Sequence, residues 1–211
     1  MTLATLKAKI VQLFDDELGG TPLGIVASVT APAQAAPQAT AQQVPSPTIV
    51  PVAWPLQAQV LGIDGMPEGP GSKWYADHIV DVTCPWPLDM DGTKVTQIAI
   101  NKLVAPSLTQ VLGAIWDAVG HDMSAIETLR YNRYSGSFNI RPMRGGEMPS
   151  MHSYGRAIDW DSEDNEQHSM HHLFTDQSLL VVKFKEAGWI WGGDWSPQSI
   201  DAMHVQAARV H

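Results

Sequence analysis

A long uncharged segment divides this chain and limits how much of it can fold into a core. Residues 20–52 are rich in Ala, Pro, Gln, Thr and Val and carry no charged side chain. Their prolines include Pro32, Pro37, Pro45, Pro47 and Pro51. This composition is typical of a disordered linker that prolines stiffen locally. We therefore expect a linker over 20–52 and a globular domain over 53–211.

The residues before the linker show one amphipathic pattern. The apolar residues that recur at helical spacing are Leu3, Leu6, Ile10, Leu13 and Phe14. Gly19-Gly20 ends the pattern, so we predict a short helix over 1–19. Because a single helix cannot bury its own apolar stripe, this helix would either pack on the globular domain or bind a partner.

Charge, hydropathy and cysteine content exclude several kinds of partner and site. The formal net charge is −9, and no cluster of Lys and Arg is present, which argues against nucleic acid as a partner. No apolar stretch reaches the length of a membrane span, and the N-terminus does not resemble a secretory signal. We therefore expect that the protein is made in the cytoplasm and does not insert into a membrane. Cys84 is the only cysteine, so an internal disulfide and a Cys-based zinc site are both excluded.

Local patterns in the globular part predict an α+β fold, with a small antiparallel sheet and helices packed on it. Residues 60–92 are rich in Gly, Pro and Asp, which predicts mostly loops. The expected helices are 105–120 and 175–187, each ended by a glycine. The expected strands are two short ones within 126–141, then 155–161, 189–191 and 203–206.

A histidine and an aspartate near the middle of the domain could bind a metal. His152 and Asp159 stand seven residues apart, with Gly155 and Ala157 between them. Gly155 permits a turn, and Ala157 leaves room on the strand that follows. Imidazole nitrogen and carboxylate oxygen are both zinc ligands. A carboxylate between apolar neighbours is costly unless a cation compensates it.

Asp201 and His204 could complete such a site. His204 would supply a third ligand, and catalytic zinc usually keeps three protein ligands and one open position. Two neutral histidines and one carboxylate leave a zinc unit with a single positive charge, which favours ionisation of water, and Asp201 could accept the proton. Arg141 is the first candidate for stabilising an oxyanion, and Arg144 is the second.

Other polar clusters have simpler explanations. The histidines His168, His171 and His172 lie in a polar run that is typical of a solvated loop. Asp89 to Gly92 resembles the start of a calcium loop, but the glutamate that such a loop needs is missing. Ser150 and Ser153 lack the G-x-S-x-G setting of a nucleophile.

The full pattern S-x-H-x-x-G-x-A-x-D over 150–159, followed by D-x-x-H over 201–204, resembles one family of zinc peptidases. This family includes D-alanyl-D-alanine carboxypeptidases, D-Ala-D-Ala dipeptidases and phage L-alanyl-D-glutamate endopeptidases. The run Trp191-Gly192-Gly193-Asp194-Trp195 is most similar to the branch of phage lysins and bacterial autolysins. The resemblance implies that His152, Asp159 and His204 bind Zn²⁺, that Asp201 is the general base, that Arg141 is the oxyanion residue, and that Arg141 and Ser150 bind substrate.

The resemblance also implies a function. It indicates a zinc metallopeptidase that cuts the peptidoglycan stem peptide, foremost as an L-alanyl-D-glutamate endopeptidase, and that reaches the cell wall through a holin-type exit. Removal of a terminal D-Ala by the same fold is an alternative. A second alternative is a zinc-stabilised binding module whose N-terminal helix docks on a partner, although such a module would not need Asp201.

Overall fold

The computed structural model describes residues 48–211, so the helix predicted over 1–19 and the linker up to residue 47 lie outside the described residues. The described part is a mixture of short helices and small antiparallel sheets, which confirms the predicted α+β class. Its helices are α2 (Gln57–Asp64), α3 (Lys73–His78), α4 (Ala105–Ala118), α5 (Met123–Thr128) and α6 (Leu179–Glu186). No helix in this part has both the length and the apolar character that a membrane span requires.

The strands form two separate antiparallel sheets. One is a ribbon of β1 (Ile79–Met90) and β2 (Thr93–Asn101). The other has the order β3-β4-β6-β5. Its strands are β3 (Tyr134–Gly136), β4 (Ala157–Trp160), β5 (Ile190–Trp191) and β6 (His204–Gln206). The pairing of β4 with β6 sets Asp159 directly opposite His204, so residues far apart in the sequence become neighbours.

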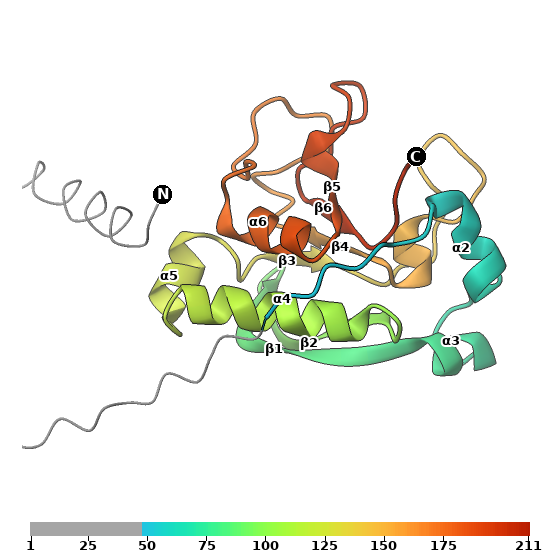
Figure 1. The fold of residues 1–211 in the computed structure, drawn as a ribbon, viewed down its shortest axis with the longest axis horizontal. Helices are drawn as coiled ribbons and strands as arrows, with labels where there is room; N and C mark the ends of the chain where they lie inside the picture. The colour runs from blue at the N-terminus through green and yellow to red at the C-terminus, as the bar shows by residue number, and fades with distance from the viewer. Residues whose placement is uncertain (1–47) are drawn as a thin grey trace, which may run out of the picture. The chain divides into compact units, whose positions relative to one another are not determined.

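The helix α4 contributes one apolar face to the core. Pro106 stands in its first turn, where the missing N–H costs nothing. Its apolar face, expected from the spacing, is buried at Leu108, Val111, Leu112 and Ile115. It packs against β1 on one side and α6 on another (Figure 1).

The prediction that residues 60–92 are mostly loops is wrong, because α2, α3 and β1 occupy much of this range. In β1, Cys84, Trp86 and Leu88 are buried and alternate with exposed Pro85 and Pro87. The register with β2 shifts between Thr83 and Leu88, and a proline in such a bulge removes no ladder hydrogen bond. The alternation of buried and exposed residues that is typical of a strand is therefore present in β1, although prolines usually indicate turns.

The prediction for 126–141 is also partly wrong. This range begins inside α5 and contains only one strand, β3. The remaining strands and helices are confirmed, although α6 begins at Leu179 and not near residue 175. Gly188, which follows α6 as predicted, has a φ of 84°.

Candidate metal centre

A tight turn between His152 and Asp159 brings their side chains close together. His152 lies in a 3-10 turn, Met151–Tyr154, and Gly155 follows it with a φ of 62°. A Cβ atom at Gly155 would lie 2.7 Å from Ile79 Cδ1 and 2.8 Å from the amide nitrogen of Asn101. Only glycine therefore fits this close approach to the β1–β2 ribbon, and the chain turns directly into β4.

His152, Asp159 and His204 meet at one point. The distance from His152 Nε2 to His204 Nδ1 is 3.2 Å, and to Asp159 Oδ2 it is also 3.2 Å. His204 Nδ1 lies 3.0 Å from Asp159 Oδ1. Both imidazoles are buried, and Asp159 is half-buried. The structure thus brings together the three residues that the sequence predicts as metal ligands.

Hydrogen bonds outside the cluster fix the orientation of both imidazoles. His152 Nδ1 lies 2.6 Å from the carbonyl oxygen of Ser137, so Nδ1–H donates and Nε2 carries the free lone pair. His204 Nε2 lies 3.0 Å from Gln206 Oε1. The amide of Gln206 donates to the Ala208 carbonyl at 2.7 Å and to Gln57 Oε1 at 3.2 Å, which leaves Oε1 as the acceptor for His204. We therefore assign the lone pair of His204 to Nδ1.

This arrangement fits a metal cation. Two imidazole lone pairs and one carboxylate converge, and neither imidazole can donate to the other in these tautomers. Burial opposes ionisation of Asp159, but the two histidines outweigh it and hold its pKa below the usual range. Burial also favours neutral His204, but Asp159 outweighs it and raises the pKa of His204. A positive charge among the three groups is thus strongly favoured, and the set of two nitrogens and one oxygen suits zinc.

Asp201 lies beside the cluster in the same cleft. It is held by its own amide, which donates to the carbonyl oxygen of Gly192 at 3.0 Å. A Cβ atom at Gly192 would lie 2.3 Å from the carbonyl oxygen of Asp201, so this close approach requires glycine. Asp201 Oδ1 is buried without a hydrogen-bond partner. Burial raises the pKa of Asp201 to about 6.

All of the predicted site residues line one cleft of about 940 Å³. They are Arg141, Ser150, His152, Asp159, Asp201 and His204, and Arg144 lines it as well. The hydroxyl of Ser150 is buried there without a partner. The discounted histidines do not form a metal cluster, because His152, Asp159 and His204 are the only such group among residues 48–211.

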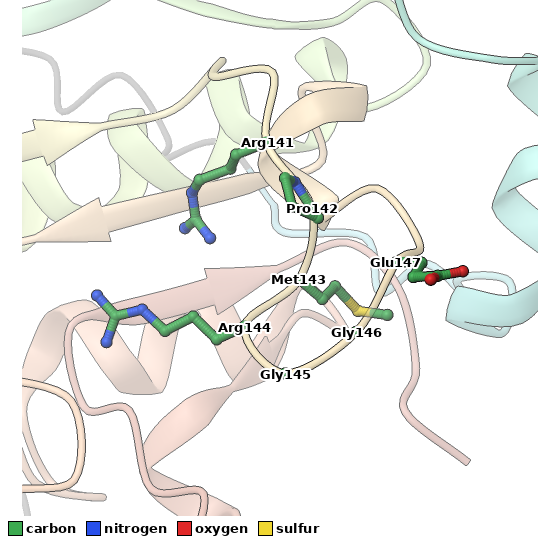
Figure 2. Close-up of a pocket in the computed structure, with 7 residues that line it drawn as sticks. All are labelled: Arg141, Pro142, Met143, Arg144, Gly145, Gly146 and Glu147. Carbon is green, nitrogen blue, oxygen red and sulfur yellow. The ribbon is translucent and has the colours of Figure 1, made fainter.

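Two arginines of the cleft, Arg141 and Arg144, stand on a loop that the Met151–Tyr154 turn holds in place. The buried hydroxyl of Ser153 accepts from the amide of Arg141 at 2.9 Å and lies 2.7 Å from the Arg141 carbonyl oxygen. The amide of Ser150 donates to the same carbonyl. Figure 2 shows the side chains of Arg141 and Arg144 extending to one side of this loop, and Glu147 extending to the other.

Sequence reasoning missed several residues of the site. Gln206 and Gln57 orient His204, and the Trp195 ring packs beside it at a tilt, with ring centroids 5.3 Å apart. Gln206 could have been found, because it stands two residues after His204 and so lies on the same face of the expected strand. Gln57 and Ser137 carry no local signal, since their roles arise only from the fold.

Comparison with known proteins gives one match. Residues 144–207 match the family model described as D-alanyl-D-alanine carboxypeptidase. Searches among curated proteins and solved structures gave no match. The match contains His152, Asp159, Asp201 and His204 and confirms the resemblance to the zinc peptidase family. It supports a hydrolase that acts as a peptidase and does not distinguish the branches of the family.

Proposed function

We propose that this chain, which matches the D-alanyl-D-alanine carboxypeptidase family over residues 144–207, is a zinc metallopeptidase that hydrolyses peptide bonds of bacterial peptidoglycan. The convergence of His152, Asp159 and His204 beside Asp201 carries the proposal. The family match supports a peptidoglycan-acting zinc peptidase in general. The donor set supports zinc as the metal.

Each residue of the cleft has a proposed task. Zinc, when bound by His152, Asp159 and His204, supplies a Lewis acid for the reaction. Asp201 accepts the proton of the attacking water and passes it to the leaving amine. Its pKa of about 6 suits both directions of transfer near neutral pH. Arg141 stabilises the developing oxyanion, and Ser150 contributes a hydroxyl to substrate binding.

The bond that we favour joins L-alanine to D-glutamate. The run Trp191-Gly192-Gly193-Asp194-Trp195 supports it, because this turn is similar to that of the endopeptidase branch, and Gly192 is the residue against which Asp201 packs. A substrate in the cell wall also requires that the protein leaves the cytoplasm, and we propose a holin-type exit. The matching family, described as D-alanyl-D-alanine carboxypeptidase, favours a second candidate, removal of a terminal D-Ala.

Mass analysis of digested peptidoglycan separates these two activities. The zinc-loaded protein is incubated with purified peptidoglycan, with His152→Ala as the control. An endopeptidase yields glycan that retains only the L-alanine of the stem, together with released peptides that begin with a new glutamyl amino terminus. A carboxypeptidase liberates free D-Ala. Tight zinc binding with neither product would instead support a binding module and would contradict the proposed function.

A further inference from the structure

The arginines of the described residues fall into two groups. Those paired with a carboxylate are Arg130 with Asp161 at 2.7 Å, Arg133 with Asp89 at 3.4 Å, and Arg156 with Asp64 at 2.7 Å. Those with no carboxylate partner among residues 48–211 are Arg141, Arg144 and Arg209. All three of these line the cleft of the candidate metal centre.

The arginines of the cleft lack carboxylate partners even though the chain contains more acidic than basic residues. The sequence has 22 Asp and Glu against 13 Lys and Arg. Within the cleft, Asp159 faces the two imidazoles, and Asp194 lies 2.7 Å from Lys185. Three aspartates line the cleft, Asp159, Asp194 and Asp201. Among them, only Asp201 forms no salt bridge with a cationic side chain and no hydrogen bond with an imidazole. Three guanidinium groups without a carboxylate partner therefore stand against one aspartate without a cationic partner, which favours anionic ligands.

Two of these arginines form hydrogen bonds to uncharged groups. These bonds position the side chains and leave their positive charge uncompensated. Arg144 donates to the side-chain oxygen of Gln167, and Arg209 Nε donates to the Trp54 carbonyl oxygen at 2.9 Å. A guanidinium has five N–H donors in a planar fork, so each retains donors for a carboxylate. Arg144 stands three residues after Arg141 and extends to the same side of the loop (Figure 2).

The two candidate substrates share one chemical feature. In an L-alanyl-D-glutamyl peptide that continues through the side-chain carboxyl of D-glutamate, and in a D-alanyl-D-alanine terminus, the carbon that follows the scissile nitrogen carries a free carboxylate. Arg141 and Arg144 line the same cleft. If Arg141 serves the scissile carbonyl, Arg144 is therefore the next cation along the same loop that could meet an anion on that carbon.

We propose that Arg144 binds this carboxylate and makes the enzyme selective for peptides in which it is free rather than amidated, while Arg209 adds to the positive potential of the cleft. The inference rests on the proposed function and deepens it. Arg144 is thus a specificity-determining residue, and its paired fork of donors matches a carboxylate but not a carboxamide.

Two synthetic peptides test this role. Both contain L-alanyl-D-glutamate, and the carboxylate that follows the scissile nitrogen is free in one and a carboxamide in the other. For the zinc-loaded full chain we expect kcat/KM to be about 10-fold higher on the free carboxylate, the size of one charge-assisted hydrogen-bond pair. Arg144→Gln is expected to remove this preference. Lys94→Gln, which removes the same charge at an exposed position outside the cleft, is expected to keep it.

Equal rates of wild-type protein on the two peptides would overturn the inference, and so would a preference that survives Arg144→Gln. Failure of the proposed function gives a different result, namely cleavage of neither peptide. In that case, calorimetry that compares the binding of the two peptides to the metal-free full chain tests whether Arg144 binds the carboxylate. About 10-fold tighter binding of the free carboxylate, abolished by Arg144→Gln, supports the inference, and equal binding of the two peptides contradicts it.

Discussion

At the scale of single residues, the site depends on hydrogen bonds that select which nitrogen of each imidazole faces Asp159. The Ser137 carbonyl orients His152, and Gln206 orients His204. The residues that converge there could be predicted from sequence, because a histidine, a glycine and an aspartate at fixed spacing carry the pattern. Their orienting partners could not, except Gln206, because a backbone carbonyl or a distant amide leaves no pattern in the sequence.

Removal of the Gln206 acceptor should weaken zinc binding. Gln206→Leu leaves His204 Nε2–H buried without its partner and frees the imidazole to adopt the other tautomer. We expect a loss of about 10- to 100-fold in zinc affinity, measured by competition with a chromophoric chelator. Gln206→Glu keeps the acceptor for His204 but loses the amide that donates to Ala208 and Gln57, so its loss of affinity should be smaller than that of Gln206→Leu. Equal losses in the two variants would show that packing, and not the hydrogen bond, is responsible.

Asp201 should affect catalysis without affecting zinc. Asp201→Asn preserves the shape of the side chain and removes its basicity. We expect kcat on peptidoglycan to fall by about 10²- to 10⁴-fold, the usual contribution of a general base, while zinc affinity stays within a few-fold of wild type. Activity that persists in Asp201→Asn would exclude this residue as the base.

At the scale of elements, the glycines predicted the local structure more reliably than the prolines did. Gly155 allows the turn between His152 and β4, as expected from its place in the pattern. Pro85 and Pro87 misled the prediction, because they stand on the exposed face of β1 in a bulge of a two-stranded ribbon. Whether a proline interrupts a strand depends on the neighbouring strand, and the sequence does not show which strand that is.

The loop that carries Arg141 should loosen when its clamp is removed. Ser153→Ala deletes the hydroxyl that bonds to both backbone groups of Arg141. Trypsin cannot readily cut before Pro142, so the exposed bond after Arg144 reports on this loop. We expect cleavage after Arg144 to be several-fold faster in Ser153→Ala, followed by mass spectrometry. An unchanged rate at this bond, with Ser150→Ala as the comparison, would show that the other loop contacts suffice.

At the scale of the whole molecule, a buried ion pair ties the first helix of the described part to the metal-site strand. Arg156 Nε lies 2.7 Å from Asp64 Oδ2, and both side chains are almost fully buried. Asn101 also donates to Asp64, at 3.2 Å. Because α2 carries both Asp64 and Gln57, the pair also secures the helix that supports Gln206. The sequence could not reveal this pair, since its members are far apart and each alone resembles a surface residue.

Loss of one partner of this pair should destabilise the protein strongly. Asp64→Ala leaves the Arg156 guanidinium buried without its carboxylate, which costs about 3–5 kcal/mol in the free energy of unfolding. Urea denaturation followed by Trp fluorescence measures this change. Lys73→Ala, which breaks an exposed pair with Asp77, is the control and should leave the unfolding midpoint nearly unchanged. A similar small effect in both variants would contradict the structural role of the buried pair.

The dependence of peptidoglycan cleavage on one bound metal ion tests the account most directly. The measurement is the release of new amino termini or free D-Ala from purified peptidoglycan by the full chain before chelation, after chelation and after addition of one equivalent of zinc. We predict that chelation abolishes release, that one equivalent of zinc restores it, and that His152→Ala is inactive throughout. Release at the original rate by the metal-free protein would contradict the account.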